Sequence, residues 1–139
     1  MNVHFSSETG EWETPQEFFD AINKEFDLNF DVCATQGNTK VSDYRFFTKE
    51  QDGLSKNWAN LRCWMNPPYG REIGKWIEKA ATGGAEIVVA LLPARTDTRW
   101  FHDHIYNKPN VEMRLLKGRL KFGGQKNSAP FPSMLVIFK

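Results

Sequence analysis

The chain has 139 residues, with 18 Lys and Arg against 17 Asp and Glu and a net charge of +1. This length supports one hydrophobic core without room for a second module, and the balanced charge means that a surface for a polyanion must be a local patch. The longest apolar run, residues 87–92, is far too short to span a membrane, and no signal peptide is recognisable. Two isolated thiols, Cys33 and Cys63, suit a reducing compartment, so we expect a cytoplasmic protein that does not bind membranes.

A flexible arm and a helix are predicted at the start of the chain. Residues 1–11 are polar and precede what we expect to be a single domain over residues 12–139. Thr14 as N-cap, Pro15 at the first helical position and Glu17 in a capping box predict the helix start. Apolar side chains recur at every fourth position after it, so one face of the helix is predicted to be buried: Phe18, Ile22 and Phe26.

Two short strands and a turn are predicted next. Leu28, Phe30 and Val32 alternate with polar residues, as in a strand with one buried face. A second strand is predicted over residues 43–48, and a turn over residues 52–54.

The stretch at 61–70 organises the rest of the chain. Leu61, Cys63 and Met65 fall on one side of this stretch and Arg62 and Trp64 on the other, which predicts a strand. Asn66-Pro67-Pro68-Tyr69 then ends the strand, because neither proline can donate to a sheet ladder. We expect Asn66, the Pro67 carbonyl and the Tyr69 ring in a stiff turn at the carboxyl end of this strand. In open α/β sheets that edge binds ligands.

This turn suits methyl transfer to an amine attached to an aromatic ring or an amide. The lone pair of such a nitrogen is delocalised, so the nitrogen is a poor nucleophile. The Asn66 side-chain oxygen and the Pro67 carbonyl can accept both N–H groups and favour the pyramidal nitrogen of the transition state. Tyr69 can stack on the planar group. The alternative interpretation is that Asn-Pro-Pro simply forms a turn and has no catalytic role.

Helices and strands alternate through the remaining chain. A helix with one apolar face is predicted after the turn, from Ile73 to the Gly-Gly pair at 83–84, and a fully buried strand over residues 86–92. A helix capped by Thr96 or Thr98 ends before Pro109. Strands over 111–117 and 133–139 close the chain, which predicts an α/β fold with a mostly parallel sheet ending in an antiparallel hairpin.

Three further groups of residues are candidates for function. A nucleotide-like cofactor across the carboxyl ends of the first strands would meet Asp31, Cys33, Ala34 and Asp52, although a solvated turn or cap also explains each carboxylate alone. A basic segment over 117–126 can clamp phosphates, and a solvated hairpin explains it nearly as well. His102 and His104 are two apart on a predicted helix and do not face each other, so no metal site is expected.

Several of these pieces together resemble the small phage-type DNA adenine methyltransferases of the Dam family. The resemblance runs from Trp12 to Phe138, and its most specific pieces are the strand and turn at 64–70, Leu-Leu-Pro-Ala-Arg-Thr-Asp-Thr at 91–98 and Gly-Arg-Leu-Lys-Phe at 118–122. It implies a minimal Rossmann-like, S-adenosylmethionine-dependent methyltransferase fold. It also implies methyl transfer to the exocyclic amine of adenine in double-stranded DNA. The chain departs from the general methyltransferase pattern at 34–37, where Ala-Thr-Gln-Gly replaces a Gly-rich loop.

The resemblance also implies roles for individual residues. The expected catalytic loop is Asn66, Pro67, Pro68 and Tyr69. The expected cofactor contacts are Thr14, Pro15, Asp31, Cys33, Ala34, Asp52 and Asn66. The expected DNA contacts are Trp12, Arg95, Arg99, Lys117, Arg119, Lys121 and Lys126.

Three hypotheses remain open from the residues alone. The first is a DNA adenine methyltransferase. The second is a methyltransferase acting on another amine, in cytosine or in a protein glutamine, since an Asn-Pro-Pro-Tyr turn serves those reactions too. The third is a nucleic-acid-binding module that keeps the fold without catalysis. The oligomeric state and the DNA recognition sequence cannot be predicted from these patterns.

Overall fold

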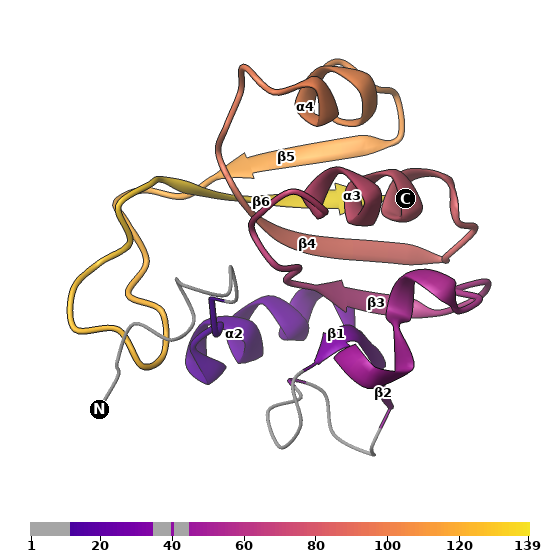
Figure 1. Cartoon of the computed structure of the whole chain (residues 1–139), viewed down its shortest axis with the longest axis horizontal. Helices are drawn as coiled ribbons and strands as arrows, with labels where there is room; N and C mark the ends of the chain where they lie inside the picture. The colour runs from indigo at the N-terminus through magenta and orange to yellow at the C-terminus, as the bar shows by residue number, and fades with distance from the viewer. Residues whose placement is uncertain (1–11, 35–39, 41–44) are drawn as a thin grey trace.

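A six-stranded mixed sheet forms the centre of the molecule in the computed structural model, which describes residues 12–34, 40 and 45–139 (Figure 1). The strand order across the sheet is β2-β1-β3-β4-β6-β5. The first four strands are parallel, whereas β6 runs antiparallel to both of its neighbours. The strands are β1 (Phe30–Ala34), β2 (Phe46–Thr48), β3 (Arg62–Met65), β4 (Ile87–Pro93), β5 (Val111–Leu115) and β6 (Ser133–Phe138).

Helices lie on both faces of this sheet. They are α2 (Gln16–Phe26), α3 (Ile73–Thr82) and α4 (Arg99–His104), and two 3-10 turns, η1 (Lys49–Gln51) and η2 (Gly53–Ser55), precede β3. Side chains of β5 that point in opposite directions show which helices lie on which face of the sheet. Arg114 reaches α2, whereas Val111 lines a cavity together with residues of α3 and α4. None of the described helices is long and apolar enough to cross a membrane.

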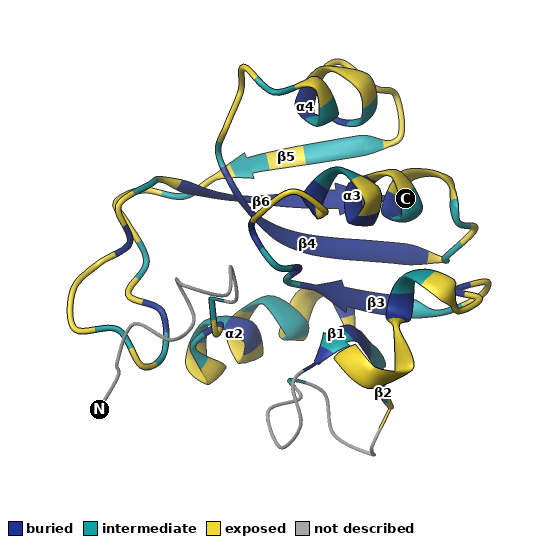
Figure 2. Ribbon diagram, viewed as in Figure 1, coloured by how far each residue is buried: buried dark blue, intermediate teal, exposed yellow. Residues whose placement is uncertain are grey.

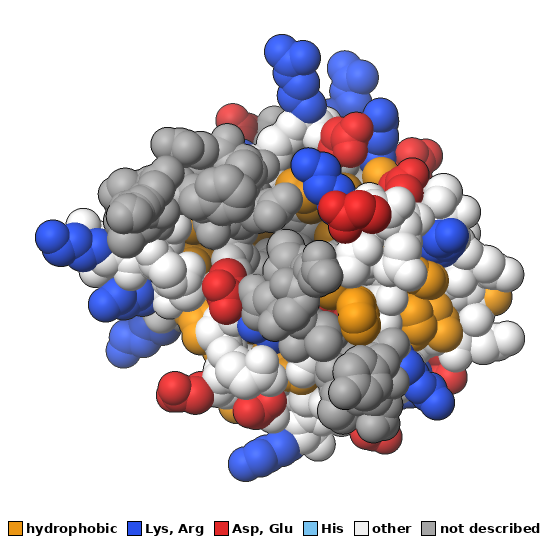
Figure 3. All heavy atoms as spheres, turned by 60° about the horizontal axis from the view of Figure 1, so that its bottom comes forward, with side chains coloured by type: hydrophobic (Ala, Val, Ile, Leu, Met, Phe, Trp, Pro, Cys, Tyr) orange, Lys and Arg blue, Asp and Glu red, His pale blue; other side chains and the backbone are white. Residues whose placement is uncertain are grey.

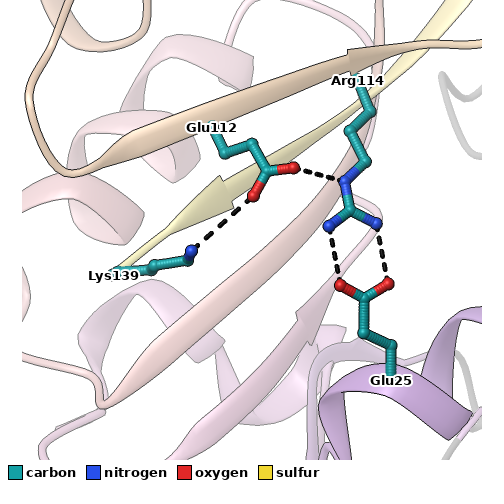
Figure 4. Close-up of polar contacts among 4 residues, drawn as sticks. All are labelled: Glu25, Glu112, Arg114 and Lys139. Atoms are coloured by element: carbon teal, nitrogen blue, oxygen red, sulfur yellow. Dashed lines mark hydrogen bonds and ion pairs between the residues drawn. The ribbon is translucent and has the colours of Figure 1, made fainter.

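A polar network ties α2 to the far edge of the sheet (Figure 4). Arg114 of β5 donates through both terminal nitrogens to Glu25 of α2, at 2.8 and 2.7 Å, and through Nε to Glu112 at 2.5 Å. The Arg114 guanidinium also lies 5.3 Å from the centre of the Phe26 ring. Two-point pairing of this kind is geometrically specific, so it connects α2 to β5 in one orientation.

Strands β4 and β6, which are neighbours in the sheet, are buried along their whole length (Figure 2). The continuous apolar run at 86–92 predicted such a strand, and β4 confirms it. On the face under α2, the rings of Phe19 and Trp64 meet edge to face, 5.1 Å apart. Truncating an aromatic side chain buried this fully costs about 3–5 kcal/mol, so these contacts hold β3 and the turn that follows it in place.

The direction of the winding changes between β1 and β3. The chain leaves β1 for β2 on one side, and it leaves β3 for β4 on the other. Loops that follow two such strands diverge and leave room for a ligand at the carboxyl edge. Asn66 follows β3 at this edge, and Asp31 to Ala34 form the end of β1.

Most predicted elements are present, but the predicted start of the first helix is wrong. The helix begins at Gln16 after Pro15, and no side chain caps its first N–H groups. The Thr14 hydroxyl is instead engaged with Asn66. The second predicted strand, over 43–48, is confirmed from Phe46 to Thr48; Arg45 lies outside the strand, and residues 43 and 44 lie outside the described part of the chain. The predicted arm over 1–11 and most of the loop at 34–37 also lie outside it.

Candidate active site

The Asn66 side chain is held by the segment that precedes α2. Its Nδ2 donates to the backbone carbonyl of Trp12 and to the Thr14 hydroxyl, the latter at 2.8 Å. Its Oδ1 is buried and accepts no hydrogen bond from the described residues. A buried acceptor without a partner is costly, so a ligand that donates a hydrogen bond to Oδ1 would bind favourably here.

Tyr69 is also fixed, and it is neutral. Its hydroxyl donates to the Leu91 carbonyl of β4 at 2.9 Å, and the residue is only 7% exposed. Burial raises the pKa of Tyr69 well above its usual value of 10, although the nearby Arg95 opposes this shift. The phenol therefore stays protonated and cannot serve as a base at neutral pH.

Four aromatic rings pack together at the turn. They are Trp12, Tyr69, Phe122 and Phe131, and we call them the aromatic cluster. Trp12 meets Phe122 at 5.4 Å and Phe131 at 5.2 Å, both edge to face. Phe131 lies 5.6 Å from the Tyr69 ring. Phe122 lies within the basic segment at 117–126, is 1% exposed and is part of this packed cluster.

Asp31 is the buried carboxylate of the site. It is 2% exposed and accepts hydrogen bonds from the backbone N–H groups of Cys33, at 3.1 Å, and Lys40, at 3.0 Å. Burial raises the pKa of Asp31 to about 6, against the opposing effect of these two bonds. A carboxylate in this setting would gain from a cationic ligand. Of its neighbours in β1, Cys33 is half-buried and Ala34 is buried.

The turn that carries Asp52 lies against the end of β1. Asp52 is exposed, has a left-handed backbone with φ of 54°, and precedes Gly53. A Cβ on Gly53 would lie 2.3 Å from the Val32 carbonyl oxygen of β1, so only glycine permits this approach. The structure thus brings Asp31, Asp52 and Asn66 to one edge of the sheet.

Exposed basic side chains flank this edge. In Figure 3 Lys and Arg side chains gather at the left, over the connection between β5 and β6. The Arg95 guanidinium lies 5.7 Å from the centre of the Phe131 ring, so it adjoins the aromatic cluster. The N–H of Gly123 donates to the Glu13 carbonyl at 2.9 Å and joins the basic segment to the strand-like residues before α2. All the predicted basic contacts are exposed: Arg95, Arg99, Lys117, Arg119, Lys121 and Lys126.

Some residues of this edge were not expected from the sequence. Phe131 belongs to the aromatic cluster, and its position between two prolines was the only available signal. Ser133 begins β6 opposite Pro93, and its buried hydroxyl has no partner among the described residues. The only local sign of Ser133 in the sequence was a single hydroxyl residue at the start of an apolar strand. Pairing between Thr14 and Asn66 could not be inferred from either local pattern.

The fold and the site together define a class of protein. It is an α/β protein whose parallel strands end in a neutral amide, a buried carboxylate and aromatic rings, with basic side chains at the rim. Such an edge suits a planar amine carried by a polyanion.

Comparison with protein families matches residues 4–139 to DNA N-6-adenine-methyltransferase (Dam). The chain belongs to the Dam family of DNA N-6-adenine-methyltransferases. It is similar to the DNA N-6-adenine-methyltransferase of Haemophilus phage HP1 (strain HP1c1), with 31% identity over 138 residues that cover 92% of this chain and 78% of that protein. The resemblance seen in the sequence is thereby confirmed. Of the three open hypotheses, the adenine-specific DNA methyltransferase is the supported one.

Proposed function

We propose that this enzyme transfers a methyl group from S-adenosylmethionine to the N6 amine of adenine in double-stranded DNA, at the edge formed by β1 and β3. The observation that carries the proposal is the Asn66 side chain. Its nitrogen is occupied by Trp12 and Thr14, and its buried oxygen is left to accept from a donor. We further propose that the strand order, with its reversal between β1 and β3, is that of a minimal Rossmann-like methyltransferase fold.

Asn66, Pro67, Pro68 and Tyr69 form the catalytic loop in this proposal. Asn66 Oδ1 and the Pro67 carbonyl accept the two N–H groups of the target amine and favour its pyramidal form. Pro68 keeps the turn rigid, because its ring fixes the backbone torsion. The Tyr69 ring stacks on the base. The nitrogen gains a positive charge as it is methylated and then loses a proton to water, so no side-chain base is required.

The residues at the carboxyl edge fit a cationic methyl donor. The Asp31 carboxylate is buried, and burial opposes its charge, so a positively charged ligand beside it would relieve that cost. S-Adenosylmethionine, when bound, supplies a methyl group activated by a sulfonium. We assign its methionine part to Thr14, Pro15, Asp31, Cys33 and Ala34, and its adenosine part to Asp52, with Asn66 at the boundary with the target base.

The rim would hold the duplex while the target base is flipped out. A base inside a duplex cannot reach Asn66 and must leave the stack first. Arg95 and Arg99 lie just past β4, and Arg95 adjoins Phe131 in the connection that also carries the basic segment, so phosphates near the flipped base can be neutralised. Trp12 contributes a ring next to the entrance. Because the substrate is DNA and a similar protein is encoded by a phage, we place the enzyme in the host cytoplasm.

A single incubation tests the proposal. The protein is mixed with labelled S-adenosylmethionine and plasmid DNA grown without adenine methylation, and the DNA is digested to nucleosides for mass spectrometry. Label in deoxyadenosine is expected, and Asn66→Ala prepared in parallel should give almost none. Label only in deoxycytidine, or only in protein, would contradict the proposal.

A further inference from the structure

We infer that Thr14, together with the backbone carbonyl of Trp12, is a positioning clamp that sets which end of the Asn66 carboxamide faces the target amine. This inference rests on the proposed function and adds a residue to it. Thr14 is 2% exposed and lies far from Asn66 in the sequence. It acts on the reaction through Asn66 and is therefore a positioning residue.

The orientation of the carboxamide follows from the chemistry of its partners. A backbone carbonyl can only accept a hydrogen bond, so the atom of Asn66 that faces Trp12 must be Nδ2. Nδ2 has two N–H groups, and the Thr14 hydroxyl accepts the second at 2.8 Å. Both donors are thus used on one side, and Oδ1 is directed away from them.

The clamp matters because the wrong orientation would oppose catalysis. If the carboxamide were rotated by half a turn, Nδ2 would meet the N–H groups of the target amine, donor against donor. Oδ1 would then face the Trp12 carbonyl, acceptor against acceptor. The Trp12 carbonyl, which can only accept, disfavours this arrangement, and the hydrogen bond from Nδ2 to Thr14 adds to the preference. The carboxamide is therefore oriented before substrate arrives, so no reorganisation is needed during the reaction.

The clamp is itself held by contacts on both sides of Thr14. The Trp12 ring packs against Phe122 and Phe131, which fixes the residue whose carbonyl is used. Glu13 accepts from the N–H of Gly123 in the basic segment. A Cβ on Gly123 would lie 3.0 Å from the Glu13 side chain, so the two backbones approach closely. The orientation of Asn66 is therefore linked to the docking of the basic segment.

Thr14 can hold Asn66 and still contact the cofactor. A hydroxyl accepts through its lone pairs and donates through its own hydrogen. The bond from Asn66 uses an accepting position and leaves the donor available to the methionine part of the cofactor. The two roles can be separated, because only the first depends on Asn66.

The first experiment compares Thr14→Val, which keeps the shape and removes the hydroxyl, with Thr14→Ser, which keeps the hydroxyl. Removal of one oriented hydrogen bond should lower kcat by about tenfold in Thr14→Val. Thr14→Ser should stay within about twofold of the wild type, on the same scale. The dissociation constant of S-adenosylhomocysteine is measured for each variant, so that an effect on the cofactor is seen separately from kcat.

The second experiment places Thr14→Val in an Asn66→Ala background. If Thr14 acts through Asn66, the second substitution has no further effect on kcat, because the group that it positions is already absent. The same fractional decrease in both backgrounds would overturn the inference, as would wild-type kcat in Thr14→Val. Wild-type label in deoxyadenosine in the same assay shows that the proposed function holds whatever Thr14 does.

A measurement without turnover tests the clamp directly in the wild-type protein. The two side-chain amide protons of Asn66 should appear in a ¹H–¹⁵N spectrum as a slowly exchanging pair, since both are hydrogen-bonded. In Thr14→Val one of them should shift and exchange faster, and in Thr14→Ser neither should. A rapidly exchanging pair in the wild type would overturn the inference even if Thr14→Val did not fold.

Discussion

Asn66 combines two opposite hydrogen-bonding roles in one side chain. Its nitrogen anchors it to Trp12 and Thr14, and its buried oxygen, which has no partner among the described residues, is the atom that we assign to the target amine. Nothing in the local sequence predicts the anchoring half of this arrangement, because the partners are 52 and 54 residues away. The role towards the target amine stays a prediction, and it came from a local pattern, the position of Asn66 after a strand and before two prolines.

Removing the Asn66 carboxamide should abolish most of the activity while leaving the cofactor bound. Asn66→Ala is expected to lower kcat by about a hundredfold or more, the usual effect of removing one oriented polar group at a reacting centre. Cofactor affinity, measured by calorimetry, should change far less. Near-normal methylation by a variant that binds the cofactor normally would show that the assigned mechanism is wrong.

Cofactor binding should weaken in mild acid because of Asp31. The pKa of Asp31 is about 6 in the protein without ligand, and a cation beside the carboxylate would lower that pKa in the complex. The complex then carries fewer protons than the apo protein, so affinity is full above about pH 7 and falls as pH decreases through 6 towards 5.

Calorimetry of S-adenosylmethionine binding between pH 5 and 7, in buffers of different ionisation enthalpy, measures this proton release. Asp31→Asn should bind more weakly and lose the dependence on pH. Asp20→Asn, an exposed carboxylate on α2, is the matched control and should behave as the wild type. Affinity of the wild type that is constant over this range would exclude Asp31 from the cofactor site.

Helices and strands with a clear hydrophobic pattern were predicted well, whereas features that depend on contacts between residues far apart in the sequence were not. The run at 86–92 predicted a buried strand and the apolar face of 73–80 an amphipathic helix, and β4 and α3 confirm both. The start of α2 was wrong because the Thr14 hydroxyl could cap a helix or bind elsewhere, and the tertiary contact prevailed. Phe131 was missed for the same reason, as packing alone places it beside Tyr69.

The β5–β6 connection should supply part of the electrostatic attraction to DNA. Four basic residues of the basic segment, Lys117, Arg119, Lys121 and Lys126, are all exposed. Replacing all four with Gln should weaken DNA binding. It should also reduce the slope of log affinity against log salt by about 0.9 for each phosphate that the variant no longer neutralises. Fluorescence anisotropy of a labelled duplex at several salt concentrations gives this slope.

A control with the same change in charge shows whether position matters. Lys24 in the last turn of α2, Lys56 ahead of β3, Lys108 and Lys139 are exposed and lie towards the amino ends of the parallel strands, away from Asn66. Their replacement with Gln should leave the slope nearly unchanged. Equal slopes for the two quadruple variants would place the DNA surface elsewhere.

At the scale of the whole molecule, the middle of the sheet is fully buried, whereas buried polar atoms at its carboxyl edge lack hydrogen-bond partners among the described residues. Strands β4 and β6 are buried throughout, whereas both buried side-chain atoms without a described partner, in Asn66 and Ser133, lie at the carboxyl edge of β3 and β4. These unpartnered polar atoms lower the stability of the fold, as is common at functional sites. A ligand that fills this edge should therefore stabilise the fold.

Binding of S-adenosylhomocysteine should raise the melting temperature measurably. At a free ligand concentration about one hundred times the dissociation constant, the stabilisation is about 2.7 kcal/mol, which corresponds to several degrees for a domain of this size. Asn66→Ala should show the same shift, since Asn66 is assigned chiefly to the target base. The absence of any shift in the folded wild type would contradict the cofactor assignment.

The packing of Trp12 against Phe122 and Phe131 has a consequence for how the enzyme meets DNA. Tyr69 is 7% exposed beneath these rings, so a base can stack on it only in molecules where the cluster has parted. Apparent affinity for a flipped base is lowered by the fraction of parted molecules; if that fraction is about one in ten, binding is about ten times weaker than the intrinsic value. Methylation then requires two events at the same time: the target base must flip out of the duplex, and the rings of the aromatic cluster must separate. Trp12 fluorescence, followed by stopped flow on mixing with DNA, would report the second.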